Sequence, residues 1–383
     1  MTRKTSLLLI TVCLSISVSF GFTACGVNTD DRNSNEPKGE LAEGLNTCPD
    51  PIIIQTDWFP EAEHGALYEL FGDGAYSVDA NNLIVSGTVH DLGTNTGLGL
   101  EVRTGGPAIG YSPVASEMYT DQSITLGYAN TEGQITRFDK APLLSIVAPL
   151  EKNPQMIMWD PNTYPDVETL TDLGEKNITI SVFFNEVFSD VFVAQEIWSA
   201  DQVDRSYEGS PANFIASGGS IAQQGFASAE PFDYKNTFEE WGKDVKFQLL
   251  HDAGFKVYSQ TIAIRPDDKT RLDTCLRTFV PVIQRAVLSY ESAPETANNI
   301  IIDAVEKYGR SWVYGKDIAT YSIETQRNLG LLGNGPNSTV GDMEESRIRN
   351  VIDIMAGAGI DTSGVTPADI FTNEYIDKNI GFK

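Results

Sequence analysis

Seven aromatic, acidic, histidine and amide side chains lie at the ends of predicted strands or at the starts of the helices that follow them. They are Asp57, Trp58, His64, Asn130, Asn185, Glu186 and Glu230. Side chains of these types can stack on a flat ring or exchange hydrogen bonds with a polar solute. Ligands of open α/β sheets bind outside the carboxyl ends of the strands, so we expect these residues to line a ligand-binding site.

Several of these positions also have a purely structural interpretation. Trp58 can be a core residue, and Asp57 can cap a loop or a helix. His64 can close the loop before a helix, and Glu186 can be an acidic residue that offsets the dipole at a helix start. The sequence leaves both interpretations open, although the strand-end position favours ligand contact for Trp58 and Glu230.

The charges at these positions indicate the kind of solute. Asp57, Glu186 and Glu230 are acidic, and no lysine or arginine is among the candidates. A nitrate or sulfonate group needs cations or free N–H donors, and carboxylates buried beside an anion are costly. We therefore expect a neutral or cationic, planar, nitrogen-bearing solute such as an aminopyrimidine or a flavin.

The sequence lacks the signatures of common catalytic and metal sites. The patterns G-x-x-x-x-G-K-[ST], H-E-x-x-H, C-x-x-C and G-x-S-x-G do not occur. The three histidines, His64, His90 and His251, are far apart in the chain and show no metal-ligand spacing. We therefore expect no catalytic residues, no metal, no cofactor and no enzymatic activity.

The composition is that of a folded, acidic protein. The chain has 383 residues, of which 41% are hydrophobic, and this suggests two globular lobes rather than one core. The formal net charge of −26 disfavours binding to nucleic acid, because the phosphate backbone would be repelled.

The first 25 residues resemble a bacterial lipoprotein signal. Arg3 and Lys4 precede an uncharged apolar stretch over 6–20, and Phe22-Thr23-Ala24-Cys25 follows with small residues before the cysteine. The prediction is a signal peptide over 1–24 and lipidation of Cys25. An ordinary secretory signal with a chance cysteine is the alternative. Residues 25–47 contain few apolar side chains and are predicted to form a disordered tether.

Two cysteines remain in the body of an exported chain. Cys13 would leave with the signal peptide and Cys25 would carry the lipid, so Cys48 and Cys275 are left. In an oxidising compartment this pair is expected to form a disulfide. Two separate buried thiols are the alternative.

Short apolar runs alternate with helical patterns along the body. Strands are predicted at 52–56, 98–102, 123–129, 143–147, 156–159, 178–184, 247–250 and 257–264. Helices are predicted at 65–71, 114–118, 166–173, 187–198, 212–224, 272–287 and 294–309. This order is typical of an α/β fold.

The opening of the body resembles a known family. Ile54–Pro60 (IQTDWFP) and then His64–Tyr68 (HGALY) are similar to the start of solute-binding proteins for thiamine pyrimidine precursors, within a wider nitrate, sulfonate and taurine group. Those proteins commonly have D-W-x-P-N followed by H-x-G-L-Y; here Glu61 replaces the Asn, and Ala66 is inserted. Further matches are Gly105-Gly106, 169–173 and 225–231, and the resemblance covers roughly residues 52–261 well.

The resemblance implies an α/β, two-lobe periplasmic-binding-protein-like (type II) fold with a two-strand hinge. The first lobe would hold residues 48–150 plus 258–383, and the second would hold residues 151–257. The chain would cross between them near 146–155 and 253–261. The small-molecule solute would be trapped by hinge closure and passed to the permease and ATPase subunits of an ABC importer.

The predicted function is therefore an extracytoplasmic solute-binding protein, lipid-anchored to the bacterial cell membrane. A protein of the same family that binds alkanesulfonate, taurine or nitrate is the first alternative. A pyrimidine-synthase-like enzyme and a sensory lipoprotein are alternatives of other classes. The enzyme branch of the fold carries a cysteine cluster, whereas residues 225–230 contain no cysteine.

Overall fold

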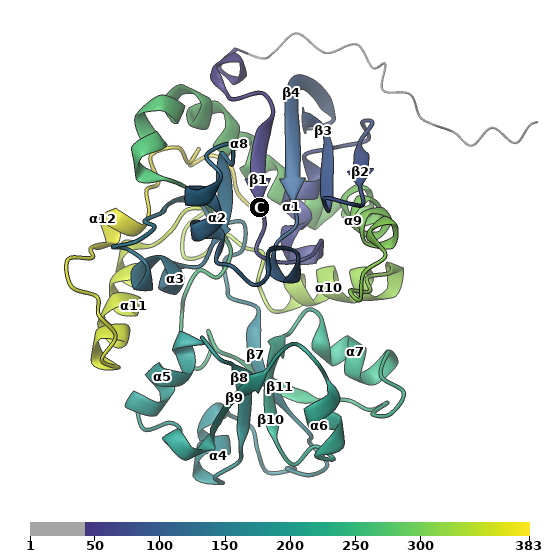
Figure 1. Cartoon of the computed structure of the whole chain (residues 1–383), viewed down its shortest axis with the longest axis vertical. Coiled ribbons are helices and arrows are strands. Elements are labelled where there is room, and N and C mark those ends of the chain that lie inside the picture. Colours follow the sequence, from purple (N-terminus) through teal and green to yellow (C-terminus); the bar gives the residue numbers. More distant parts are fainter. Residues whose placement is uncertain (1–42) are drawn as a thin grey trace, which may run out of the picture. The chain divides into compact units, whose positions relative to one another are not determined.

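The computed structural model describes residues 43–383, which belong to one compact unit (Figure 1). The predicted signal peptide, the lipidation site Cys25 and most of the predicted tether lie outside the described residues. The last residues assigned to the tether are folded: Leu45–Thr47 form a 3-10 helix, and Leu45 is buried in the core. The folded part therefore begins before residue 48.

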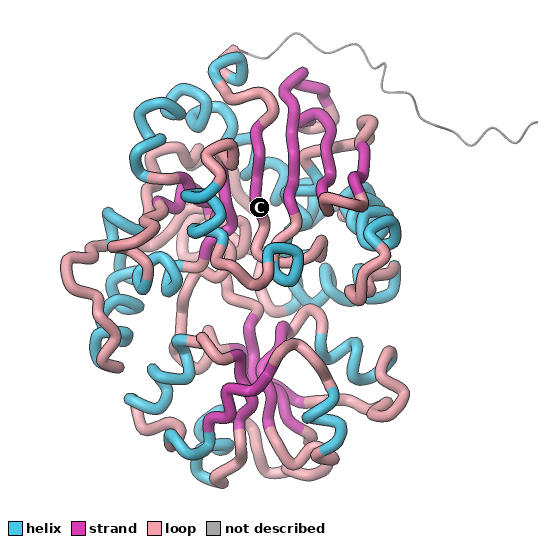
Figure 2. Tube along the Cα trace, viewed as in Figure 1, coloured by secondary structure: helices cyan, strands magenta, loops and turns pink. Residues whose placement is uncertain are grey.

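The first sheet has seven strands in the order β2-β3-β4-β1-β5-β12-β6. Strands are magenta in Figure 2. The strands are β1 (Ile52–Gln55), β2 (Ser77–Asp79), β3 (Ile84–Asp91), β4 (Thr94–Arg103), β5 (Leu126–Ala129), β6 (Leu144–Val147) and β12 (Thr261–Ile264). β1 lies in the middle and pairs in parallel with β4 and β5, whereas β12 runs antiparallel to β5 and β6. The apolar run of β1 suits a strand that is covered on both faces.

Helices from distant parts of the chain surround this sheet (Figure 1). They are α1 (Gly65–Glu69), α2 (Val114–Thr120), α3 (Thr131–Thr136), α8 (Lys269–Ser292), α9 (Glu295–Tyr308) and α10 (Lys316–Asn328). The three- and four-residue spacing of Leu272, Leu276, Phe279 and Ile283 predicts the buried face of α8, and the structure buries all four. α9 ends at Gly309 in a left-handed conformation, as its predicted C-terminus requires.

The second sheet has five strands in the order β11-β7-β10-β8-β9. They are β7 (Gln155–Trp159), β8 (Ile180–Phe183), β9 (Val203–Tyr207), β10 (Ala222–Phe226) and β11 (Lys246–Leu249). β8 pairs in parallel with β9 and β10, while β7 runs antiparallel to β10 and β11. Its helices are α4 (Leu170–Glu175), α5 (Val187–Ala194), α6 (Ala212–Ala216) and α7 (Glu230–Asn236).

One predicted helix, over 212–224, is wrong in its second half. α6 ends at Ala216, and Gly218 and Gly219 follow with positive φ angles that interrupt the helix. The chain then enters β10, in which Gln223 and Gln224 are buried and bond to Tyr234 and Glu186. Buried glutamines give no strand periodicity in a sequence, because their burial depends on partners elsewhere in the fold.

The two sheets are connected by two stretches of chain, after β6 and after β11, and by the C-terminal region. α11 (Glu345–Gly357) contacts both α3 and α5, and its apolar face joins the hydrophobic cluster of the second sheet. The lobe boundaries predicted from the sequence remain a prediction, and α11 contacts elements assigned to both lobes.

Arg347 on α11 connects the two stretches of chain. Its side chain is only 6% exposed and donates to the carbonyls of Glu151 at 2.8 Å, Lys256 at 2.6 Å and Val257 at 2.9 Å. It also forms an ion pair with the Glu151 carboxylate, and its guanidinium lies 3.7 Å from the ring centroid of Tyr258. One buried cation therefore satisfies backbone acceptors on both connections.

A disulfide joins Cys48 to Cys275 on α8, 227 residues further along the chain.

In the described part of the chain, no helix combines the length and the apolar character that a membrane span requires.

Candidate solute-binding site

The loop after β1 supplies the acidic and histidine residues of the first sheet. Asp57 follows β1 and is partly exposed, whereas His64 is fully buried. The His64 Nε2 lies 2.7 Å from Asp57 Oδ1, and the His64 ring meets Tyr128 edge-on with 4.9 Å between centroids. His64 is thus placed to orient the Asp57 carboxylate rather than to contact solvent.

Trp58 lies in a set of aromatic rings, which we call the aromatic set: Trp58, Tyr111 and Trp312. The centroid of Trp58 is 6.0 Å from that of Tyr111 and 6.1 Å from that of Trp312, and the two indoles are nearly perpendicular. Gly106, at φ +58°, makes room for the indole, because a Cβ there would lie 2.5 Å from the Trp58 ring. The lack of a side chain at Gly106 therefore allows the indole to take this position.

The second sheet contributes two carboxylates. Glu230 begins α7, and its Oε2 accepts a hydrogen bond from the Phe226 N–H at 2.7 Å. Glu186 precedes α5, and its Oε1 accepts from Gln224 Nε2 at 2.7 Å. Burial raises the pKa of Glu230 to about 7 and raises that of Glu186 as well.

Contacts between residues of the two sheets bring these groups together. Ser228, after β10, donates to Glu63 Oε1, in the loop after β1. Tyr321 and Ser322 of α10 donate to the carbonyls of Ala227 and Ser228 at 3.0 and 2.7 Å. The carboxyl ends of β1 and β10 therefore face each other.

A second acidic pair involves the end of β5. Glu132, in the first turn of α3, is buried, and its Oε2 has no hydrogen-bond partner among the described residues. Burial first, and then the charge of Glu186, raise the pKa of Glu132 to about 8. Glu132 follows β5 of the first sheet and Glu186 follows β8 of the second sheet. Their carboxylates repel each other when both are ionised.

We call the residues at these facing strand ends the edge site. It comprises Asp57, Trp58, Glu61, Glu63, His64, Tyr111, Tyr128, Glu132, Glu186, Glu230 and Trp312. Five of the predicted residues, Asp57, Trp58, His64, Glu186 and Glu230, lie in it, and a role for each in solute binding remains a proposal. Two differ: the Asn130 side chain is used to cap α3 at Gly133 N, 2.7 Å away, and Asn185 is exposed without a side-chain hydrogen bond to another described residue.

The sequence-based prediction missed Glu61 and Glu63, although both lie in the loop between Trp58 and His64. Their alternation with apolar residues suggests surface charge, yet both are buried. The departure of Glu61 from the family pattern was the signal that could have identified it. Trp312 lies more than 240 residues away and carries no local signal, because only the tertiary fold places it beside Trp58.

The buried carboxyl groups predict how stability depends on pH. Burial raises the pKa of Glu132 to about 8 and the pKa values of Glu151 and Glu230 to about 7, against a usual value of 4.5. The unfolded chain has already released these protons at pH 6.5, whereas the folded chain must release them between pH 6.5 and 8.5. The free energy of unfolding should therefore fall over this range by about 3–4 kcal/mol.

Urea denaturation at constant ionic strength between pH 6.5 and 8.5 would measure this slope. Burial, and then Arg347, lower the pKa of His251 to about 3. This shift makes the free energy of unfolding rise with pH, but only below about pH 6.5, where the unfolded histidine takes up a proton. Glu132→Gln should make the slope shallower. Stability that is constant or rises over this range would contradict the prediction.

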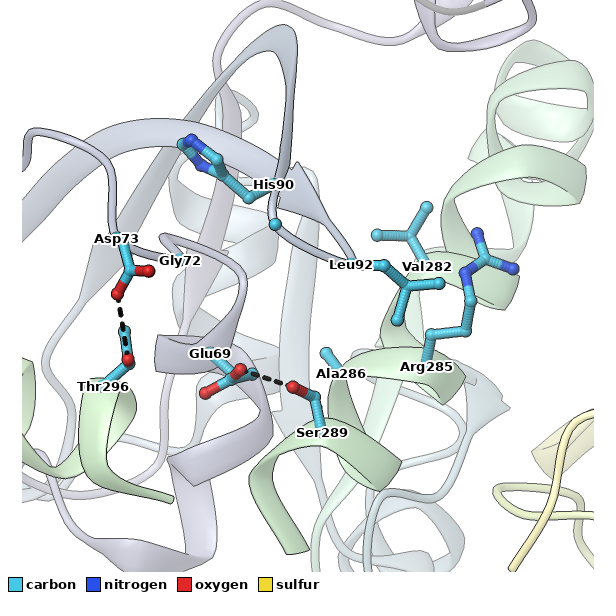
Figure 3. Close-up of a pocket in the computed structure, with 11 residues that line it drawn as sticks. Glu69, Gly72, Asp73, His90, Leu92, Val282, Arg285, Ala286, Ser289 and Thr296 are labelled. Atoms are coloured by element: carbon cyan, nitrogen blue, oxygen red, sulfur yellow. Dashed lines mark hydrogen bonds between the residues drawn. The ribbon is translucent and has the colours of Figure 1, made fainter. Parts of the chain in front are cut away.

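Two pockets in the described part of the chain lie away from the edge site. The first, of about 220 Å³, is lined by α1, α8, α9 and the turn between β3 and β4 (Figure 3). There Ser289 donates to Glu69 and Thr296 to Asp73, as the close-up shows. The second, of about 530 Å³, lies beside Trp198. Across the described residues, no group of three His, Cys, Asp or Glu is arranged to hold a metal ion.

No protein-family model matches the chain, and no curated protein is similar to it in sequence. Solved structures are similar in fold. A protein from Bordetella bronchiseptica RB50 has a TM-score of 0.54 at 15% identity, covering 85% of this chain and 95% of its own. The alkanesulfonate-binding protein SsuA from Xanthomonas axonopodis pv. citri, bound to MOPS, has a TM-score of 0.51 at 12% identity, covering 85% of this chain and 99% of its own.

The periplasmic aliphatic sulphonate binding protein SsuA from Escherichia coli also has a TM-score of 0.51 at 12% identity, covering 81% of this chain and 86% of its own. At these identities the similarity concerns the fold. The chain thus has the periplasmic-binding-protein fold that the sequence predicts.

Proposed function

We propose that this chain is the extracytoplasmic solute-binding protein of an ABC importer and captures a small, planar, nitrogen-bearing solute at the edge site. The observation that carries the proposal is the set of acidic and aromatic side chains at facing strand ends of two sheets. In open α/β folds, ligands bind at such carboxyl ends. The fold, shared with periplasmic binding proteins, supports the same assignment.

The charges of the edge site favour a neutral or cationic solute. Its members include six carboxyl groups and neither lysine nor arginine. The nearby arginines are engaged: Arg205 bonds to Asp190 and to the carbonyls of Phe184 and Glu186, and Arg137 bonds to Gly133 and Thr136. An anion would therefore find no free cation at the site, and any carboxyl group that ionised would repel it.

Exposed apolar rings next to these charges suit a flat solute. Tyr111 is 53% exposed and belongs to the aromatic set, and Phe184, directly after β8, is 70% exposed. Stacking of a planar ring between aromatic faces from both sheets would cover them.

The location and partners belong to the same proposal. The signal-like segment over 1–24 and Cys25 support export and attachment by lipid. A solute-binding protein held in this way would deliver its solute to the permease and ATPase subunits of the importer.

A sulfonate-binding function is the second candidate. Two of the similar structures are named as sulfonate-binding proteins. Isothermal titration with an aminopyrimidine, riboflavin, taurine and nitrate separates the candidates. We expect the aminopyrimidine or riboflavin to bind; binding of taurine or nitrate alone would refute the argument from charge.

Trp58→Ala should weaken binding of the solute identified in this way by about tenfold, because one stacking face of the site is lost. Titration of the wild type and the variant under the same conditions measures this change. Leu92→Ala, which removes an exposed apolar side chain at the turn between β3 and β4, is the control and should leave the affinity unchanged. Equal affinities of the wild type and Trp58→Ala would remove Trp58 from the site.

A further inference from the structure

Glu61 is an unusual carboxylate within the edge site. It is only 8% exposed, and its side chain forms no hydrogen bond with another described residue. A buried carboxylate normally has a cation or several donors beside it. Glu61 instead has three carboxylates nearby, Glu63, Asp57 and Glu230. Burial, and then these neighbours, raise its pKa well above its usual range.

Aromatic faces lie in the same part of the site. Glu61 follows Trp58 by three residues, and the indole N–H of Trp312 donates to the carbonyl of Pro60 at 3.2 Å. Trp58 and Trp312 are nearly perpendicular at 84°. Two indole faces beside a carboxylate are a common arrangement for binding a positively charged nitrogen, since the ring quadrupole and the carboxylate both attract it.

Among the described residues, no lysine or arginine side chain stacks on these two indoles. In the described part of the chain, the lysine and arginine side chains stacked on aromatic rings lie over Trp241, Tyr375 and Tyr258 instead. The edge site contains a second polar group without a hydrogen-bond partner among the described residues, the buried hydroxyl of Tyr128. Burial, and then the charge of Asp57, raise the pKa of this hydroxyl. One face of Trp312 stacks on Phe59, with 6.2 Å between the ring centroids. The edge site thus combines buried polar atoms that lack a partner among the described residues, indole rings and six acidic side chains.

We propose that Glu61 and the aromatic set bind a positively charged nitrogen, so that the solute is a cationic planar heterocycle rather than a neutral one. This inference rests on the proposed solute-binding function. A bound cation would favour the ionised form of Glu61, which would then supply the opposite charge, and the indoles supply the faces that a pyridinium-like or protonated pyrimidine ring requires. It is also the position at which the sequence departs from the D-W-x-P-N pattern, so charge selection would distinguish this chain from proteins with asparagine there.

A pair of probes that differ only in charge tests the proposal. 1-Methylnicotinamide carries a fixed positive charge, and 3-methylbenzamide is its neutral analogue of the same shape. Titration of the full folded chain should show binding of 1-methylnicotinamide at least about tenfold tighter than that of 3-methylbenzamide. Glu61→Gln should abolish this preference by weakening the cationic probe while the affinity for the neutral probe changes little.

Glu306→Gln is the matched control, because it removes an exposed carboxylate on α9. It should leave both affinities unchanged. The melting temperature separates binding from folding: Glu61→Gln removes a buried carboxyl group that has no hydrogen-bond partner among the described residues, so its melting temperature should equal or exceed that of the wild type. A fall in melting temperature without loss of the charge preference would assign Glu61 a structural role and overturn the proposal.

The remaining outcomes separate this inference from the proposed function. Equal binding of the two probes by the wild type overturns the charge selection. If neither probe binds, while riboflavin or another neutral solute does, the inference fails and the solute-binding function stands. If no solute of any charge binds, and native mass spectrometry finds no co-purified ligand, both proposals fail.

Discussion

Arg347→Met is expected to lower the free energy of unfolding by about 3–5 kcal/mol. The substitution keeps much of the side-chain volume but removes every hydrogen bond that the guanidinium makes to Glu151, Lys256 and Val257. Three backbone carbonyls, of which that of Val257 is buried, then lose this donor, and the Glu151 carboxylate loses its counter-ion. Both stretches of chain between the sheets are affected together, because the same side chain holds both.

Arg349→Met on the same helix is the matched control. Arg349 is more than half exposed and pairs only with Glu345, so its loss should cost no more than about 0.5 kcal/mol. Urea denaturation followed by circular dichroism would compare the two variants. A small effect at Arg347, similar to that at Arg349, would show that other contacts hold the two connections.

Removal of the disulfide should have the second large effect on stability. The Cys48→Ser, Cys275→Ser double variant frees a loop of more than 200 residues in the unfolded chain. The expected loss is about 2–5 kcal/mol, measured as a lower midpoint of unfolding in urea. A reducing agent should lower the midpoint of the wild type to nearly that of the variant and should leave the variant unchanged. No difference between the oxidised wild type and the variant would contradict this expectation.

Strands whose burial is encoded in local apolar runs could be predicted from the sequence. Ile52–Ile54 and Met156–Trp159 form strands because β-branched and large apolar residues follow each other without interruption. The hairpin of β2 and β3 was missed, since Ser77–Asp79 is short and partly exposed. β9 was missed for a similar reason: of its five residues, only Tyr207 is buried.

The candidate site could be predicted only where its residues lie close together in the sequence. Asp57, Trp58 and His64 share one loop, so a local motif identified them together. Asn130 illustrates the limit of the rule: it does follow a strand, but its amide oxygen is used to cap the next helix. Residue type and strand-end position do not distinguish a capping side chain from one that is free to bind a solute.

The contributions of Trp312 and Ser228 could not be predicted. Each meets the loop after β1 through contacts that span more than 160 residues of sequence. Such contacts depend on how α10 and the second sheet approach the first sheet. The residues next to Trp312 and Ser228 in the sequence form no pattern that predicts this arrangement.

The position of the disulfide also determines how the protein would carry a mechanical load. Under the proposed attachment at Cys25, tension from the membrane would enter the fold at the 3-10 helix Leu45–Thr47 and then reach Cys48, four residues before β1. The cross-link diverts that tension into α8, a helix of 24 residues packed along the sheet. The central strand β1 would then not be pulled directly. The strand ends proposed to hold the solute would keep their spacing while the predicted tether is under tension.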